Sequence, residues 1–337
     1  MKAKRGLALL MVAGIAVLLS LVGYFGFASV AAALAAVGWG LFLIPLFHLV
    51  PLLLSSLGWQ ALHSGTWPSP IAVFLRARWI RESIDGLLPV GQVGGELIGA
   101  RMLTKHGAKA SAAVAGCIVD LTMEVVSQFF FGLVGLGLLV ARHGYSGPVY
   151  WLIVGVCVAA PALLGFVLAQ RWGLFKLVER GLESLAQWLG LDSLGQMTGL
   201  HDAIAAIHRD RRGLAVSFMW HFSSWVIGAG EIWLALHFMG QPADFGTALI
   251  LESLGQAVRS AAFVVPGAFG VQEVGFVVLG AILGLDPEVG LAVSLVKRVR
   301  DLALGLPGLL AWQLAEGHTL MRWLKSGSSP TGRRQGE

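Results

Sequence analysis

Charged residues are scarce in this chain. Asp, Glu, Lys and Arg make up 13% of its 337 residues, whereas soluble proteins carry about 25%. Hydrophobic residues make up 56%, and the mean hydropathy is +0.76. So few charged side chains cannot cover the surface of a soluble fold, which excludes a soluble globular domain. The composition therefore predicts an all-α polytopic membrane protein.

Cysteines and catalytic motifs are scarcer still. Cys117 and Cys157 both fall within apolar segments, and we interpret them as buried free thiols because no pattern for a disulfide framework is present. The chain contains no HExxH, P-loop or GxSxG motif and no His/Cys cluster at metal spacing. We therefore predict no catalytic residues, no metal and no cofactor. An enzymatic function is less favoured than a non-enzymatic one, and the sequence leaves both open.

Apolar sequence is abundant. Stretches of about 20 apolar residues predict membrane-spanning helices. Six such stretches occur, at 6–28, 36–60, 110–140, 149–170, 213–239 and 291–315. The first follows a short basic segment, as in a signal peptide, but it is longer than a signal-peptide core. We interpret it as an uncleaved helix.

The net charge of +5 is small, and Lys and Arg gather at the ends of apolar segments. This distribution is typical of orientation signals and argues against a nucleic-acid partner. Because residues 1–5, 171–212 and the tail are rich in Lys and Arg, both termini are expected on the cytoplasmic side of the cytoplasmic (inner) membrane. We predict one integral membrane domain over 1–320 and a disordered cytoplasmic tail over 321–337.

Two hydrophobic regions, 70–105 and 244–284, are interrupted by proline and glycine. In each, a glutamate follows a proline at the same spacing, as LPVGQVGGE at 88–96 and PGAFGVQE at 266–273. The break residues are Pro89, Gly91, Gly94 and Gly95 in the first region and Pro266, Gly267 and Gly270 in the second. Broken hydrophobic segments in both halves of a membrane chain are typical of transporter binding sites.

We expect each interrupted region to enter and leave the membrane on the same face. The six full spans and two oppositely facing re-entrant hairpins then form an inverted-repeat arrangement, with the hairpins meeting near the midplane. Irregular backbone at that depth must line a protein interior or a wet cavity. The alternative that 244–264 and 267–284 each cross the membrane stays open.

Ionisable side chains also interrupt the apolar segments, where each costs at least about 2.5–3.5 kcal/mol. The candidate substrate and cavity residues are Glu96, Arg101, Asp120, Glu124, Glu252, Arg259, Glu273, Lys297, Arg298, Arg300 and Asp301. Asp120 and Glu124 share a helix face, where they form either a titratable wall or structural ion pairs. Arg101 would hold the carboxylate of Glu96 or a phosphate.

Residues four apart on a helix predict local ion pairs. The pairs expected from this spacing are Arg78 with Glu82, Arg81 with Asp85 and Lys297 with Asp301. The first two favour a solvated helix at the membrane interface. Glu231, with His221 earlier in the same apolar segment, is interpreted either as part of a relay or as a buried neutral group.

The motif at 88–96, with Arg101 and Asp120 after it, resembles the first signature of the lysylphosphatidylglycerol-synthetase transmembrane-region family of flippase-like membrane proteins. The motif at 266–273, with Lys297 and Arg298 after it, resembles that family's second signature. The resemblance spans roughly 5–315, and the two signatures in this order are specific. It is closest to the branch associated with hopanoid biosynthesis.

This resemblance implies a membrane domain that translocates or presents lipids, with the two breaks and their charged residues as its site. Synthetases of the family carry a soluble aminoacyl-transferase domain after the membrane part, and without it we expect no lipid aminoacylation by this chain alone. We interpret the protein as a passive or ion-coupled lipid translocator whose partner is a hopanoid or a phospholipid headgroup. A membrane-embedded lipid-modifying enzyme and a scaffold for lipid-biosynthesis enzymes are the alternatives. The oligomeric state is not predicted.

Overall fold

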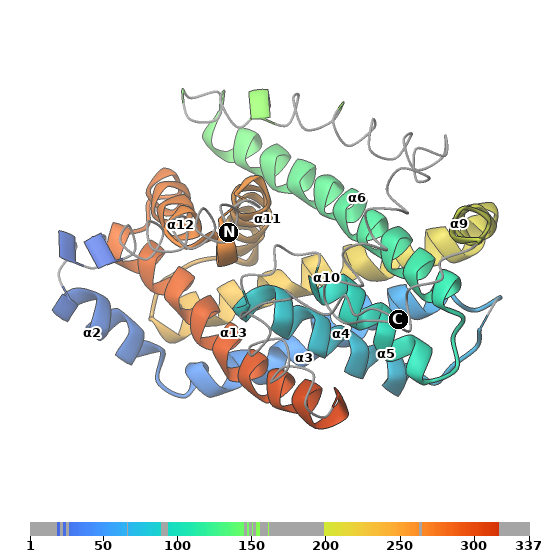
Figure 1. Cartoon of the computed structure of the whole chain (residues 1–337). Coiled ribbons are helices and arrows are strands. Elements are labelled where there is room, and N and C mark those ends of the chain that lie inside the picture. Colours follow the sequence, from blue (N-terminus) through green and yellow to red (C-terminus); the bar gives the residue numbers. More distant parts are fainter. Residues whose placement is uncertain are drawn as a thin grey trace, which may run out of the picture.

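The computed structural model describes residues 27–65, 67–88, 94–144, 199–262 and 265–316, with a few isolated positions elsewhere (Figure 1). Every regular element within these residues is helical, which confirms the all-α class. In chain order the elements are α2 (Phe27–Val37), α3 (Gly40–Ala61), α4 (Ile71–Leu87), α5 (Gly94–Lys105), α6 (Ala110–His143), α9 (Leu200–Arg209), α10 (Arg211–Phe238), α11 (Phe245–Ala261), the 3-10 turn η2 (Pro266–Ala268), α12 (Val271–Ile282) and α13 (Pro287–Glu316).

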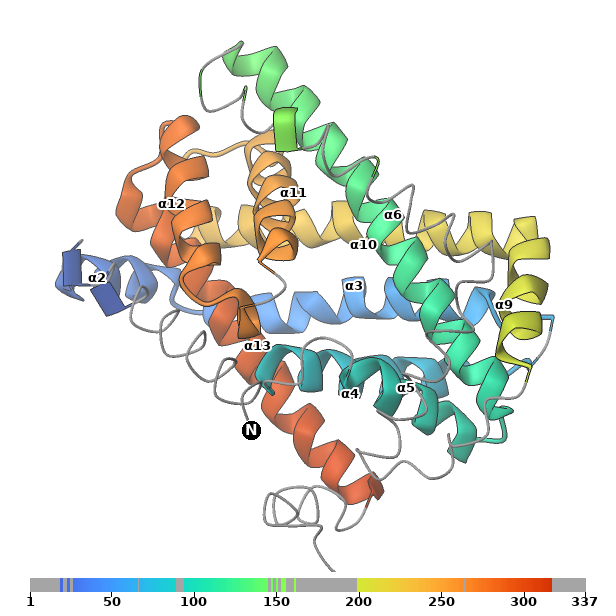
Figure 2. The same ribbon diagram turned by 45° about the horizontal axis from the view of Figure 1, so that its top comes forward.

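Two sets of four helices share the same order of lengths. The first half, α3 to α6, has helices of 22, 17, 12 and 34 residues. The second half, α10 to α13, has helices of 28, 17, 12 and 30 residues. The helix α3 lies along α10, while α13 packs against α4 and α6 packs against α11 (Figure 2). Each half therefore places its long last helix against the first short helix of the other half.

The two interrupted regions each form a 17-residue helix followed by a 12-residue helix. In the second break, Gly267 and Gly270 have φ angles of 60° and 79°, which glycine adopts without steric cost. In the first break, Gly94 and Gly95 begin α5, whereas Pro89 and Gly91 lie outside the described residues. The re-entrant course of both regions stays a prediction.

Side-chain caps set where the helices of the second half begin. Asp210 accepts a hydrogen bond from the backbone N–H of Gly213 at 2.9 Å before α10, and Asp244 accepts one from Thr247 at 2.8 Å before α11. Such caps satisfy backbone donors that the first helical turn leaves free. The guanidinium of Arg142, which donates to the exposed Asp244 at 2.8 Å, holds the pKa of that carboxyl below its ordinary value.

Four predicted spans fall on long helices. The segments 36–60, 110–140, 213–239 and 291–315 correspond to α3, α6, α10 and α13. Of the described helices, Gly40–Ala61 and Ala110–His143 are long and apolar enough to cross a membrane by length and composition. The segments 6–28 and 149–170, and the tail over 321–337, lie almost wholly outside the described residues.

Apolar side chains both fill the interior and cover much of the outside. Trp59, Phe74 and Leu103 belong to a buried core of the first half, against which the apolar face of α9 and Trp312 of α13 also pack. Phe276 and Val293 belong to a second core that α6 and α10 to α13 share. Many large apolar residues on α3, α10, α12 and α13 are exposed. Charged groups lie inside and apolar groups outside, as a bilayer environment requires.

Candidate functional site

Asp120 on α6 lies at the centre of a buried group of ionisable side chains. We define the first ion cluster as Arg78, Arg81, Glu82, Asp85, Glu96, Asp120, Glu124 and His221. The Oδ2 atom of Asp120 accepts hydrogen bonds from Nη1 of Arg78 at 2.9 Å and from Nη1 of Arg81 at 2.7 Å. Its Oδ1 atom accepts a hydrogen bond from Nε2 of His221 on α10 at 2.9 Å. Three donors thus offset the desolvation of a fully buried carboxylate.

The two arginines of α4 connect three helices of the first half. Nη2 of Arg81 lies 2.7 Å from Glu96 on α5 and 3.0 Å from Glu124 on α6. Arg78 also contacts Glu124, at 2.8 Å. Both arginine side chains are buried, so the prediction of a solvated interfacial helix is wrong. Carboxylates from α5 and α6 take the place of water around the two guanidinium groups.

The predicted pair of Arg81 with Asp85 is replaced by a cap at the first break. Asp85 accepts the backbone N–H of Gly95 at 3.0 Å, and a Cβ atom at Gly95 would collide with the Asp85 carboxylate. This contact ties the end of α4 to the start of α5. Glu96 follows Gly95 directly, so the cap also fixes where Glu96 lies. The ion pair to Glu96 comes from Arg81, whereas the sequence offered Arg101 on α5 for that contact.

The second break is held by Glu273 and Arg298. The fully buried Glu273 accepts the backbone N–H of Gly270 at 2.7 Å, which caps α12. Nε of Arg298 on α13 lies 2.9 Å from Glu273, and its Nη1 donates to the carbonyl oxygen of Gly267 at 2.6 Å. The ring of Phe269 lies 4.3 Å below the same guanidinium. One arginine therefore contacts three parts of the break.

The remaining charges of α13 pair within the second half. Nζ of Lys297 lies 2.7 and 2.5 Å from the two oxygens of Glu252 on α11. The predicted pair of Lys297 with Asp301 is therefore wrong, because Glu252 lies across the helix interface and offers both oxygens. Asp301 contacts Arg300 at 2.6 Å and Arg259 at 3.7 Å. We define the second ion cluster as Glu231, Glu252, Arg259, Glu273, Lys297, Arg298, Arg300 and Asp301.

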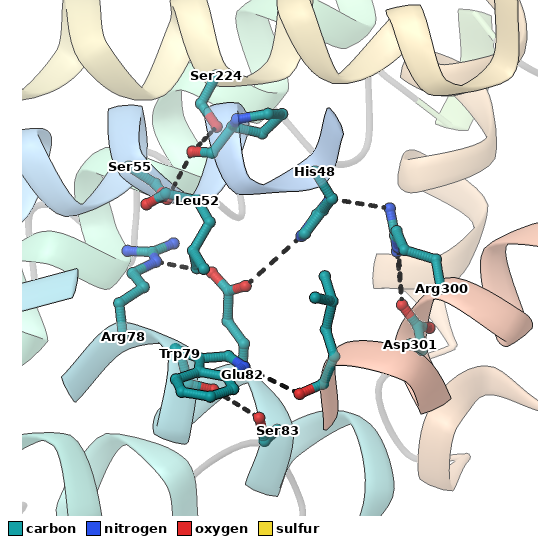
Figure 3. A network of polar contacts seen from close by, with 12 residues as sticks. His48, Leu52, Ser55, Arg78, Trp79, Glu82, Ser83, Ser224, Arg300 and Asp301 are labelled. Carbon is teal, nitrogen blue, oxygen red and sulfur yellow. Dashed lines mark hydrogen bonds and ion pairs between the residues drawn. The ribbon is translucent and has the colours of Figure 1, made fainter. Parts of the chain in front are cut away.

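His48 on α3 connects the two ion clusters (Figure 3). Its Nδ1 atom donates to Glu231 of α10 at 2.6 Å, and Arg300 pairs with the same carboxylate. Its Nε2 atom lies 3.9 Å from Glu82, which pairs with Arg78 at 2.8 Å. A chain of polar contacts therefore runs from one cluster to the other through a single imidazole.

Sequence reasoning did not place His48, Arg78 or Arg81 among the site residues. The sequence did contain a signal for His48, because it is the only ionisable residue within the apolar helix α3. An ionisable group in such a helix marks a functional site by default. The sequence left two interpretations open for Glu231. In the structure this buried carboxylate forms ion pairs with Arg300 and His48 and is not isolated.

Both breaks also carry buried polar atoms that have no hydrogen-bond partner among the described residues. At the first break this atom is the acceptor Oε2 of Glu96. At the second break the atoms are Nη2 of Arg298, a donor, and Oε1 of Gln272, an acceptor. Buried polar atoms in folded proteins are nearly always satisfied, so such exceptions need an explanation. One explanation is a ligand that offers a donor to Glu96 and an acceptor to Arg298. Within the described residues, no group of His, Cys, Asp and Glu is placed to hold a metal ion.

Long helices with apolar exteriors and an interior of ion pairs define a multi-pass helical membrane protein with a polar core. The chain matches the family model described as the lysylphosphatidylglycerol synthase TM region over residues 11–308, and it belongs to that family. This confirms the resemblance drawn from the two signatures. No curated protein and no solved structure is significantly similar to the chain. Membership indicates a function connected with membrane lipids.

Proposed function

We propose that the protein translocates an amphipathic lipid across the cytoplasmic membrane, with both of its own termini on the cytoplasmic side. The headgroup would occupy the charged interior between the two breaks, and the acyl or polycyclic tail would stay in the bilayer. The lipid would be a phospholipid or a hopanoid with a polar headgroup. The observation that carries this proposal is the unsatisfied acceptor of Glu96 at one break and the unsatisfied donor of Arg298 at the other.

The cost of placing charge in the membrane supports a functional role for the interior. A structural core would be about as stable with apolar residues in place of buried ion pairs. The chain instead carries charged residues from seven of the described helices into its interior. A headgroup with both a phosphate and a donor group can exchange partners with these side chains, so that charge is never left unpaired during passage.

The repeated order of helices supports movement of one half against the other. Transporters built from inverted repeats carry their broken helices near the midplane and alternate access by rocking around them. We infer that the interrupted regions 70–105 and 244–284 are re-entrant and oppositely facing. Each would then bring its glutamate, Glu96 or Glu273, to the same depth.

Reconstitution into liposomes tests the proposal. The full chain is inserted into phosphatidylcholine vesicles that contain a fluorescent phospholipid, and leaflet exchange is measured by quenching from outside. We expect exchange that is lost in Glu96→Gln and in Arg298→Gln and kept in the control Asp202→Asn, which changes an exposed carboxylate on α9. A parallel set of vesicles with a labelled hopanoid separates the two lipid classes.

The other outcomes point to different functions. Exchange that is absent for both lipid classes with the wild-type chain contradicts translocation. Chemical change of the lipid, detected by mass spectrometry, would identify a membrane-embedded lipid-modifying enzyme. If cells that carry Glu96→Gln together with Arg298→Gln keep normal lipid composition, a scaffold for lipid-biosynthesis enzymes would explain the family membership better.

A further inference from the structure

A cavity separate from both ion clusters lies where α9 meets α10. Its volume is about 660 Å³, within the roughly 300–1,000 Å³ of small-molecule sites. In Figure 2, α9 lies at the beginning of α10 and beside the first part of α6. The described residues that line the cavity include His201, Ile204, His208, Arg209, Arg211 and Leu214. Two of these six residues are arginines and two are histidines, and none is acidic.

The sequence of α9 explains how it presents these groups. Leu200, Ile204 and Ile207 are buried and pack into the core of the first half, which fixes the helix in place. His201 and His208 are seven residues apart and therefore lie on one helix face, two turns from each other. Nδ1 of His208 donates to the carbonyl oxygen of Ile204 at 2.9 Å, which orients the ring and leaves Nε2 for another partner.

The arginines of this cavity are not paired with a carboxylate of any described residue. Arg209 and Arg211 are exposed and form no ion pair with any described residue, in contrast to the buried arginines of both ion clusters. Asp210 lies between them, but its carboxylate caps α10 by accepting the N–H of Gly213. Nδ1 of His201 is buried and has no hydrogen-bond partner. The described lining therefore includes two arginines and two histidines and no carboxylate.

The position of the cavity suits the surface of a bilayer. A helix of 28 residues such as α10 is about 42 Å long, whereas the hydrocarbon core is about 30 Å thick. The end of α10 that carries Arg211 and Arg212 is the one suited to the headgroup region, where basic residues at the ends of apolar helices gather. The lining combines basic groups with the apolar side chains of Ile204 and Leu214, which matches a phosphate attached to an apolar body.

We propose that the α9–α10 cavity binds a phosphate-type anion, carried either by a lipid headgroup at the membrane surface or by a free phosphate compound. Arg209 and Arg211 would hold the anion by charge-assisted hydrogen bonds, and His201 would donate through its unpartnered ring nitrogen. This site is independent of the proposed translocation pathway. None of its residues belongs to either ion cluster.

Binding to the purified full chain in uncharged detergent tests this assignment. The probes are dihexanoylphosphatidate, which carries short acyl chains, and inorganic phosphate. Two arginine contacts predict that Arg209→Gln with Arg211→Gln weakens binding about tenfold or more. The matched control is Arg212→Gln, which removes an exposed charge from the next position outside the described lining and should change binding less than about twofold. Restoring the charge as Arg209→Lys with Arg211→Lys should recover part of the affinity.

The two probes distinguish the source of the anion. Arginine-dependent binding of dihexanoylphosphatidate alone supports a lipid headgroup, whereas equal arginine dependence for inorganic phosphate supports a free phosphate compound. If neither probe binds, or if Arg212→Gln weakens binding as much as the double variant, general surface charge explains the data and the assignment fails. Loss of leaflet exchange in Glu96→Gln with unchanged phosphate binding would show that the two sites are separate.

Discussion

Replacing Asp120 by Asn tests how strongly the first ion cluster stabilises the fold. The substitution keeps the shape of the side chain but removes its charge and turns one acceptor oxygen into a donor amide. That amide must face either the guanidinium groups of Arg78 and Arg81 or the ring of His221, all of which donate to Asp120. At least one buried donor therefore loses its acceptor.

The expected loss follows from the contacts that remain. Removing one member of a buried ion pair costs about 3–5 kcal/mol, chiefly because its partner stays buried and unpaired. Arg78 keeps its pair with Glu82, both arginines keep Glu124, and Arg81 keeps Glu96. His221 keeps no other acceptor among the described residues. We expect Asp120→Asn to lower the free energy of unfolding by about 3 kcal/mol, at the lower end of that range.

Titration with sodium dodecyl sulfate in mixed micelles, followed by circular dichroism, measures this free energy. The control Asp202→Asn removes an exposed carboxylate from α9 and should change it by less than about 0.5 kcal/mol. A double-mutant cycle with Arg78→Gln should give a coupling energy above about 1 kcal/mol, as contacting residues do. A loss below about 1 kcal/mol for Asp120→Asn would refute the view that this carboxylate holds the cluster together.

Three further substitutions test other contacts. His48→Ala removes the hydrogen bond to Glu231 and should lower the free energy of unfolding by about 1–3 kcal/mol in the same titration. Gly267→Ala places a side chain at a φ of 60° and should lower the free energy of unfolding by about 1–2 kcal/mol. Its control is Gly132→Ala, where a Cβ meets open space inside α6, and this change should be neutral or stabilising. Asp244→Asn should cost up to about 1 kcal/mol at pH 7, because the exposed carboxyl has a pKa below its ordinary value. The stabilisation from a lowered pKa is present above about pH 4 and is lost as the pH falls further. The free energies of unfolding of the wild type and of Asp244→Asn should therefore converge in acid. A difference between them that stays constant from pH 7 to pH 3 would contradict this reasoning.

The sequence predicted the elements better than it predicted their contacts. Apolar length was enough to place α6 and α10 near their observed bounds, because a helix that faces lipid needs a continuous apolar surface. Proline and glycine marked both breaks, since Gly267 and Gly270 hold backbone conformations that other residues rarely adopt. These features depend on neighbouring residues along the chain, which a sequence displays directly.

The ion pairs could not be read in the same way. A spacing of four residues suggested Lys297 with Asp301, and this local pair would stabilise an isolated helix in water by only about 0.2–0.5 kcal/mol. In the interior each charge must replace its whole hydration shell, which favours a partner across a helix interface. Glu252 provides both of its oxygens to Lys297 from 45 residues away. Periodicity carries no information about such distant partners.

The division of the ion pairs between the two halves gives the histidines a distinct role. Among the buried groups that the structure describes, each ion pair of Lys or Arg with a carboxylate joins two members of the same half. Buried carboxylates receive contacts from the opposite half through imidazoles: His221 of α10 donates to Asp120 of α6, and His48 of α3 donates to Glu231 of α10. A guanidinium presents several donors in a fixed fork and can bind more than one carboxylate, whereas an imidazole has only two ring nitrogens. Each half is therefore held together inside by ion pairs of Arg and Lys, while the buried carboxylates are linked across the halves by single imidazole nitrogens. Among the described residues, the exposed pair of Arg142 with Asp244 is the one contact of a guanidinium with a carboxylate between the halves. A rocking movement of one half against the other would break the histidine contacts and the exposed pair of Arg142 with Asp244, and it would leave the buried arginine contacts intact.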